Sequence, residues 1–393
     1  MELARTLKDR VCIVGLGQSE YSRWGGIVDR SEFQLACEVI MAAAADAGVE
    51  VTAIDGIASF ANDRNEAVHL QAALGLPRLG FACMVWGGGG GGAAGAVMHA
   101  AAAIHAGLAN YVVVFRSLCQ GQFQRFGSGE GYAPDANFAA PFGLMTPAQM
   151  QALLIRRHMY LYGTTSEQLG AVAVACRKHA NRNPRAVMYG RPLTIAEHQH
   201  SRMIADPLRL YDCCLESDGA CAVLLTSAER ARDLRQRPVY IMAAAQGNSA
   251  GWGAGPAGWH NMPAESYTTA NLLPVADDLY RKAGLGPADV DVAQLYETFT
   301  GMVILTLEDL GFCRPGEGGP FVAAGRIEWP NGELPINTGG GNLSEAYIHG
   351  LTHVLEGVRQ LQGTSTSQVA DAEICLVTSG PGATPNSGLI LRR

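Results

Sequence analysis

The sequence predicts an α/β protein built from two similar halves, because segments of the same kind recur in the same order. A short apolar strand follows a charged segment at residues 10–15 (RVCIVG) and again at residues 237–242 (RPVYIM). Next, in each half, a helical run ends at Ala-Gly and an acidic turn leads into an apolar strand, at residues 45–60 and 281–299. Glycine at such a position supplies the left-handed conformation that ends a helix.

A third repeat places glycines before a helix. Residues 84–107 (MVWGGGGGGAAGAVMHAAAAIHAG) hold six consecutive glycines and then an alanine-rich helix, and residues 337–361 (NTGGGNLSEAYIHGLTHVLEGVRQL) hold three glycines and then an amphipathic helix. An apolar strand follows each helix, YVVVF from Tyr111 and EICLV from Glu373. We therefore expect one duplicated architecture.

We place the N-terminal half at residues 1–235 and the C-terminal half at residues 236–393. Between about residues 120 and 211 the sequence pattern changes, first to polar and aromatic turns (GQFQRFGSGEGYAPDANFAAPFG) and then to helical runs. This segment is expected to be an insertion into the first half. Insertions of this kind commonly form a lid or a substrate-binding face.

Composition and charge exclude several classes of protein. The chain has 393 residues, of which 48% are hydrophobic and 17% charged, a balance typical of a globular protein with a deep core. Its net charge of −7 disfavours a nucleic-acid or anionic-membrane partner. We find neither the h-region of a signal peptide nor an apolar run of membrane-spanning length. Ten cysteines without a CxxC pair indicate neither a zinc ribbon nor a disulfide framework, and favour a cytoplasmic location.

The glycine runs allow two interpretations. Small residues permit helices to pack closely, which is a purely structural role. Alternatively, the unpaired N–H groups of a helix N-terminus can hold a developing oxyanion, because glycine lets a ligand approach the backbone. In a duplicated fold, two such N-termini would converge on one site and stabilise charge beside a carbonyl group.

The order of these segments resembles the thiolase superfamily, especially the sterol-carrier-protein-X-like branch with its lipid-transfer-protein homologues. The likeness covers nearly the whole chain: the Ile-Asp-Gly turn at Ile54, the helix ending AIHAG, RRHMYLYGTT, ADPLRLYDCCLESDGACAV, YETF and GGGNLSEAYIHG. The resemblance implies a five-layered α/β/α/β/α fold, commonly a homodimer, that acts on acyl-CoA thioesters.

The positions that match catalytic residues of thiolases depart from that family. The nucleophilic cysteine would fall near Gly90, where there is no thiol. Tyr296 stands in the asparagine position of the NEAF-type motif, and Tyr347 stands in the histidine position of the Gly-His-Pro motif. Thr378 and Ser379 stand at the place of the last catalytic cysteine of that family. Without a thiolate and its activating histidine, covalent acyl transfer loses its essential parts, so we expect no thiolysis.

These substitutions resemble the thiolase-like aldolases of bacterial steroid side-chain breakdown. That branch cleaves CoA thioesters whose β-carbon carries a tertiary alcohol, giving a ketone and a shorter acyl-CoA such as propionyl-CoA by retro-aldol chemistry. It works with a small partner that combines a zinc ribbon and an OB-fold, and the chain itself is expected to need no metal and no cofactor besides the CoA thioester. We expect Tyr296 and Tyr347 to be the acid–base pair, with the assignment of acid and base left open.

Four further positions are candidates around this pair. Backbone N–H groups near Gly90 and Gly382 are expected to hold the thioester oxygen. His349 either tunes Tyr347 or is a packed side chain, and His260, in GWGAGPAGWHNMP, either borders the acyl site or belongs to a turn.

Three residues outside this group and two other functions complete the expectations. Cys119 and Cys313 are expected to be structural, and Asp218 is expected to hold a turn. One alternative function is a CoA-dependent thiolase that recruits Cys119 or Cys313 as its nucleophile. The other is an acyl-CoA-binding homologue without catalysis.

Overall fold

The computed structural model of the chain describes residues 6–86, 89–123, 139–250, 267–380 and 385–393. Ten described strands form one continuous sheet. The first half contributes β1 (Val11–Gln18), β2 (Ser22–Arg23), β3 (Gly56–Phe60), β4 (Phe81–Val85), β5 (Tyr111–Leu118) and β8 (Ser217–Ser227). The second half contributes β9 (Val239–Gly247), β10 (Val292–Gln294), β11 (Ile374–Ser379) and β12 (Asn386–Arg392).

The two halves of the sheet repeat one strand pattern. In the first half, β8 lies antiparallel between β1 and β5, and β5 runs parallel to β3. In the second half, β12 lies antiparallel between β9 and β11, and β11 runs parallel to β10. The halves join where β1 pairs with β9, Cys12 opposite Tyr240 and Ile13 opposite Val239. This correspondence is the internal repeat that the sequence predicts.

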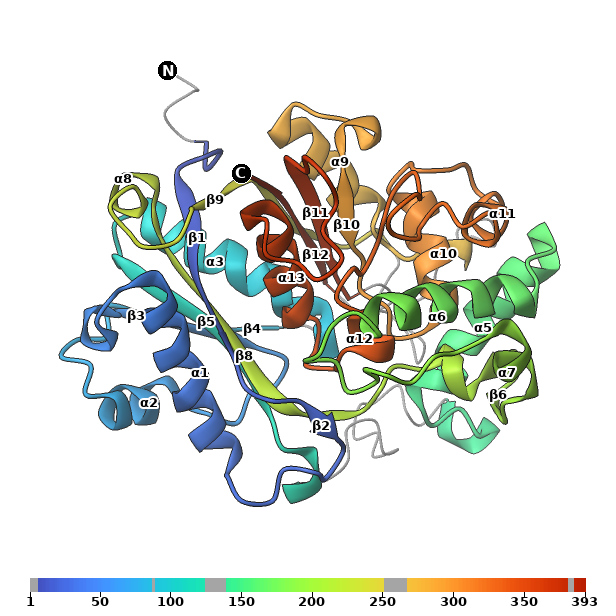
Figure 1. Cartoon of the computed structure of the whole chain (residues 1–393), viewed down its shortest axis with the longest axis horizontal. Helices are drawn as coiled ribbons and strands as arrows, with labels where there is room; N and C mark the ends of the chain where they lie inside the picture. Colours follow the sequence, from blue (N-terminus) through green and yellow to red (C-terminus); the bar gives the residue numbers. More distant parts are fainter. Residues whose placement is uncertain (1–5, 87–88, 124–138, 251–266, 381–384) are drawn as a thin grey trace.

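Helices complete five layers. The helix α1 (Glu32–Ala47) packs on β1, β5 and β8, with α2 (Ala67–Leu74) beside it, and α9 (Leu273–Ala283) packs on β9 and β12. Between the halves lie α3 (Ala93–His105) and α13 (Leu351–Gln362), which contact strands of both (Figure 1). The alanine-rich helix α3 is buried along most of its length, as expected for a central layer. The predicted five-layered α/β/α/β/α fold is confirmed.

The predicted helix ends are confirmed as well. Ser31 and Gln34 form a reciprocal capping box at the start of α1, and Gly48 ends the helix with φ of 74°. In the second half, Gly284 ends α9 with the same φ of 74°. Both glycines adopt the left-handed conformation that the Ala-Gly pattern predicts.

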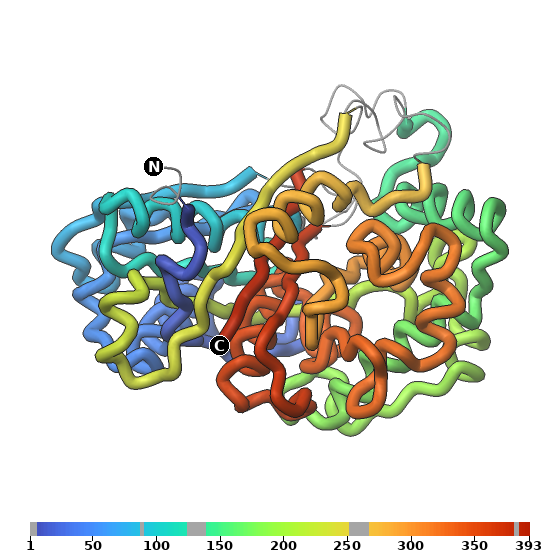
Figure 2. Tube along the Cα trace, turned by 90° about the horizontal axis from the view of Figure 1, so that it is seen from above, coloured from blue at the N-terminus to red at the C-terminus, as the bar shows by residue number. Residues whose placement is uncertain are grey.

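The segment that is expected to be an insertion forms a helical layer beside the sheet (Figure 2). It holds α5 (Pro147–Tyr162), α6 (Ser166–Ala180), α7 (Ile195–His200) and the hairpin of β6 (Met203–Ala205) and β7 (Leu208–Arg209). Helix α6 contacts three helices of the second half: α10 (Thr300–Asp309), α11 (Gly318–Ala323) and α12 (Gly341–Ser344). The short α8 (Ala228–Ala231) follows β8. No helix among the described residues is both long and apolar enough to cross a membrane.

The second glycine run differs from its prediction. It does not lead directly into the long helix: the glycines open the four-residue α12, and α13 begins only at Leu351. The reason is a turn in which Gly340 and Gly341 have φ of 113° and 60°. A Cβ atom on Gly341 would overlap the carboxylate of Glu297. The turn therefore makes room for Glu297 and leaves Tyr347 in the segment between the two helices.

Candidate active site

The structure brings Tyr296 and Tyr347 together. Tyr296 follows β10, whereas Tyr347 lies between α12 and α13, and their phenol oxygens are 3.0 Å apart in a hydrogen bond donated by Tyr296. The rings meet edge to face, with centroids 6.3 Å apart. Tyr296 is 2% exposed and Tyr347 is 8% exposed, so the hydroxyl pair lies in the interior.

Gly90, a described residue of the hexaglycine run, gives the Tyr296 ring its space. A Cβ atom on Gly90 would overlap the ring and its hydroxyl, and a Cβ atom on Gly350 would lie 2.5 Å from the same ring. Gly90 lies in the short 3-10 turn Gly89–Gly92 that leads into the central helix α3, and Gly350 is the N-cap of α13. The N-terminal ends of both central helices therefore meet at the Tyr296 ring. The backbone N–H of Tyr296 donates a hydrogen bond to Thr378 Oγ1 at 3.1 Å. Close approach of the Tyr296 side chain accounts for glycine at position 90.

Serine side chains bind the first turn of α3. The N–H of Ala94 donates to Ser379 Oγ, and the N–H of Gly95 donates to Ser387 Oγ, both at 2.9 Å. These two donors are thus already used within the fold, and Ser379 has a clear structural role. The other expected oxyanion donor, Gly382, and the candidate His260 lie outside the described residues.

His349 packs against Tyr347. Its ring lies 5.0 Å from the Tyr347 ring, and its Nδ1 accepts a hydrogen bond from Arg116 Nε at 3.2 Å. Arg116 is buried and forms an ion pair with Asp63 at 2.7 Å. Burial, followed by the charge of Arg116, lowers the pKa of His349 well below its usual value. His349 is therefore a neutral buried ring whose orientation is set by Arg116.

A second buried pair lies behind Tyr296. Nε2 of His353 is 2.7 Å from Oε2 of Glu297, and the His353 ring lies 6.0 Å from the Tyr296 ring. Although burial lowers the pKa of His353, the carboxylate of Glu297 raises it, and the net pKa lies above the ordinary value. The local sequence does not predict this pair: Glu297 stands within YETF, but no spacing connects it with a residue 56 positions away.

Both phenols are held in the neutral form. Burial raises the pKa of Tyr296 far above its ordinary value, and the neighbouring Tyr347 adds to this effect. Burial likewise raises the pKa of Tyr347, although the hydrogen bond from Tyr296 and the charge of Arg116 act in the opposite direction. At neutral pH the pair therefore offers proton donors but no resting phenolate.

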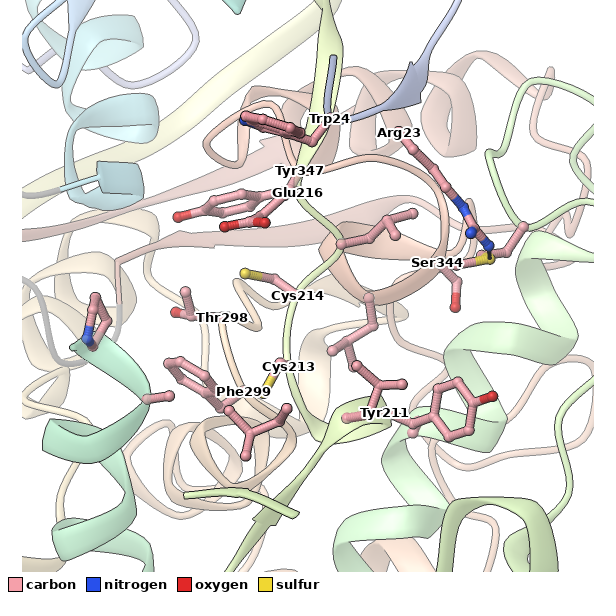
Figure 3. A pocket seen from close by; sticks show the side chains of 18 of the residues that line it. Arg23, Trp24, Tyr211, Cys213, Cys214, Glu216, Thr298, Phe299, Ser344 and Tyr347 are labelled. Atoms are coloured by element: carbon pink, nitrogen blue, oxygen red, sulfur yellow. Dashed lines mark hydrogen bonds between the residues drawn. The ribbon is translucent and has the colours of Figure 1, made fainter. Parts of the chain in front are cut away.

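A cavity of about 850 Å³ opens beside Tyr347. Tyr347 lines it, whereas Tyr296 is not among its lining residues. Figure 3 shows Tyr347, Glu216, Cys214 and Thr298 along one part of the wall. Three arginines and two exposed or half-buried aromatic side chains also line the cavity: Arg23, Arg177, Arg202, Trp24 and Tyr211. The substrate is therefore expected to meet Tyr347 rather than Tyr296.

Comparisons with known proteins agree with this geometry. A family model for the thiolase C-terminal domain-like region matches residues 256–392. The chain is 46% identical to 17-hydroxy-3-oxo-4-pregnene-20-carboxyl-CoA lyase of Mycobacterium tuberculosis, over 98% of this chain and 100% of that protein. A solved structure of an Ltp2-ChsH2(DUF35) aldolase superimposes with a TM-score of 0.90 at 43% identity, covering 98% of both chains. The chain belongs to the thiolase superfamily, in its branch of steroid side-chain-cleaving aldolases.

The superfamily fold is shared more widely than its chemistry. Human mitochondrial 3-ketoacyl-CoA thiolase superimposes with a TM-score of 0.68 at 14% identity, covering 98% of this chain and 99% of that one. That likeness concerns the fold alone. Members of the aldolase branch are carbon–carbon lyases, and this chain is an enzyme of that class.

The described cysteines do not replace the thiolase nucleophile. Cys119 is buried, Cys313 is half-buried, and neither lines the cavity. Burial is the main cause that raises the pKa of each thiol to about 12. Cys213 and Cys214 do line the cavity, although the sequence does not mark them as site residues. Burial raises the pKa of Cys214 well above its ordinary value, so its thiol is protonated and a poor nucleophile.

The expected structural role of Asp218 is confirmed. Its carboxylate accepts the N–H of Ile27 at 3.3 Å and the N–H of Gln120 at 2.9 Å. Asp218 thus ties two loops to the start of β8, next to the segment that carries Cys214 and Glu216.

Proposed function

We propose that this enzyme cleaves the side chain of a steroid CoA thioester that carries a tertiary β-hydroxyl group. The products would be a ketone and a shorter acyl-CoA, such as propionyl-CoA. The observation that carries the proposal is the pair of hydrogen-bonded phenols, 3.0 Å apart, with Tyr347 at the wall of a cavity. The relative from Mycobacterium tuberculosis is named for a 20-carboxyl-CoA thioester of a 17-hydroxy steroid, which supports this substrate class.

The two tyrosines are proposed to play different roles in proton transfer. Tyr347 lines the cavity and is the phenol that transfers a proton to the substrate. Tyr296 lies behind it and donates a hydrogen bond to its oxygen. That bond stabilises the charge on Tyr347 once the proton has left, because hydrogen bonds to charged groups are stronger than those between neutral groups. No cofactor takes part in this scheme.

The cavity suits such a substrate. Its volume of about 850 Å³ lies within the range of about 300–1,000 Å³ that is common for ligand sites. Its wall combines apolar and aromatic side chains with the guanidinium groups of Arg23, Arg177 and Arg202. Guanidinium groups bind phosphates well, so these arginines are proposed to face the CoA portion while the apolar wall receives the steroid.

A homodimer and a small partner protein belong to the same proposal. Strand β4 ends the sheet, and beyond β3 it pairs with no other described strand. Exposed apolar side chains accompany this edge, with Trp86 83% exposed and Met84 54% exposed. Open apolar edges of this kind invite coverage by another chain. The solved structure is named an Ltp2-ChsH2(DUF35) aldolase, and this name supports a small partner protein. The proposed partner is of the zinc-ribbon and OB-fold type.

Product analysis tests the function directly. The enzyme, together with its OB-fold partner, is mixed with a tertiary β-hydroxyacyl-CoA of a steroid, with and without free CoA, and the products are identified by mass spectrometry. We expect a ketone and a shorter acyl-CoA in both mixtures. Cleavage only of a β-ketoacyl-CoA, and only with free CoA, would instead establish a thiolase.

Replacing Cys214 with serine changes a single atom and distinguishes retro-aldol cleavage from thiolase chemistry. Cys214→Ser is expected to keep kcat within a few-fold of the wild-type value, because the retro-aldol scheme forms no bond to sulfur. A thiolase that used this cysteine would lose its activity, since serine is a far weaker nucleophile. Steady-state kinetics of wild type and variant provide the measurement, with Cys313→Ser as the matched control outside the cavity.

A further inference from the structure

A carboxylate lies beside Tyr347 in the cavity. Glu216 and Tyr347 are paired across an isolated parallel β-bridge, and both side chains line the cavity. Residues paired in this way present their side chains on the same face. Figure 3 shows the carboxylate and the phenol pointing in the same direction from this wall. Among the described residues that line the cavity, Glu216 carries the only carboxylate.

Hydrogen bonds fix Glu216 and Tyr347 relative to each other. The carbonyl of Glu216 accepts the N–H of Trp24 at 3.0 Å, and the N–H of Tyr347 donates to Ser217 Oγ at 3.1 Å. Next to Glu216, the N–H of Leu215 donates to the carbonyl of Asn342 at 2.8 Å. The two segments are therefore held together before any ligand binds, as a site for proton transfer requires.

The proposed reaction lacks a base if it relies on the tyrosines alone. It must remove the proton of the β-hydroxyl group, yet burial keeps both phenols neutral. The charge of Glu216 further raises the pKa of Tyr347 and so keeps that phenol protonated. A glutamate carboxylate is a common general base, and here it lies within the same cavity as the proton donor.

We propose that Glu216 is the general base of the cleavage and that it returns the proton it takes to Tyr347. This inference rests on the retro-aldol function proposed above. The Glu216 carboxylate takes the hydroxyl proton. As the ketone forms, the bond between the α- and β-carbons breaks and its electron pair passes into the thioester enolate. Tyr347 gives its proton to the α-carbon, and Glu216 returns the hydroxyl proton to the Tyr347 oxygen, so that the enzyme ends as it began.

Steady-state kinetics of Glu216→Gln test the assignment. The variant keeps the shape of the side chain but removes the base, so kcat is expected to fall about 100- to 10,000-fold with little change in KM. Glu333→Gln is the matched control: Glu333 is exposed, pairs with Arg326 at 3.3 Å and does not line the cavity. Its kcat is expected to equal that of the wild type. Circular dichroism and thermal melting check that each variant is folded.

Two further readouts distinguish a base from a structural side chain. The pH profile of kcat/KM is expected to differ in shape between the wild type and Glu216→Gln, because the variant removes the carboxylate from the described cavity wall. Among the described residues, the other titratable or charged side chains that line this cavity are Arg23, Arg177, Arg202, Tyr211, Cys213, Cys214 and Tyr347. For Glu216→Ala, added formate is expected to restore part of kcat by occupying the space of the missing carboxylate.

The outcomes separate this assignment from the proposed function. If the wild type cleaves the steroid β-hydroxyacyl-CoA while Glu216→Gln keeps the wild-type kcat and pH profile, Glu216 is not the base and the retro-aldol function stands. If the wild type does not cleave that substrate, the proposed retro-aldol function is wrong, and the assignment of Glu216 as its base is wrong as well. If Glu216→Gln does not fold, a folded Glu216→Ala that formate fails to rescue overturns the assignment.

Discussion

Replacing Tyr347 with phenylalanine is expected to lower kcat for side-chain cleavage by about 1,000-fold, within the range for removal of a general acid. The substitution deletes one oxygen atom and keeps the ring, so its contact with the His349 ring remains. It also removes a hydrogen-bond acceptor from Tyr296. The melting temperature is expected to change little compared with the loss of kcat. Kinetic assays of product formation measure the loss of kcat, and thermal melting of the same preparation measures the change in melting temperature.

Tyr296→Phe is the natural comparison. It leaves Tyr347 in the cavity wall but removes the hydrogen bond to its oxygen. Hydrogen bonds to charged groups contribute about 1.5–3 kcal/mol, which corresponds to a loss of about 10- to 150-fold in kcat. Full activity in both variants would contradict the role of the pair. A larger loss in Tyr296→Phe than in Tyr347→Phe would show that the roles are reversed.

Local patterns predicted the scaffold because the scaffold depends on local chemistry. The Ala-Gly ends of α1 and α9 follow from the left-handed φ that Gly48 and Gly284 supply. The repeated strands follow from short apolar runs at matching places in the two halves. The second glycine run misled for the same reason: its local pattern predicts a helix start, but Gly341 instead makes room for Glu297, a residue from another segment.

The site was only partly predictable, because its chemistry depends on distant pairs. Resemblance to a family motif indicated Tyr296 and Tyr347, which are 51 residues apart in the chain. Glu216 lies in a stretch that carries the family resemblance and the turn expected at Asp218, and its bridge to Tyr347 spans more than a hundred residues. Nothing in the local sequence marks such a contact. The same limit applies to Glu297 with His353.

Position 90 is expected to be the most sensitive glycine of the central helix start. Gly90→Ala would place a methyl group where the Tyr296 ring lies, and that ring cannot simply retreat because Gly350 also borders it. Overpacking of a buried site costs about 1–3 kcal/mol of unfolding free energy. Displacement of the ring would also break the hydrogen bond to Tyr347. We therefore expect a lower free energy of unfolding together with a large loss of kcat, measured by denaturant titration and by kinetics.

A double-mutant cycle links that loss to Tyr296 rather than to glycine itself. In a Tyr296→Ala background the ring is gone, so Gly90→Ala is expected to cost much less than in the wild type, a strong non-additivity between contacting residues. Gly286→Ala is the matched control, because its Cβ atom would meet its nearest neighbour only at 3.9 Å. Equal costs of Gly90→Ala in both backgrounds would contradict the steric explanation.

The same overlap makes a prediction for Gly90→Cys, which restores a thiol at the position of the thiolase nucleophile. We expect this variant to displace Tyr296 and to show no thiolase activity, because the Tyr296 ring occupies the space that the thiol would need.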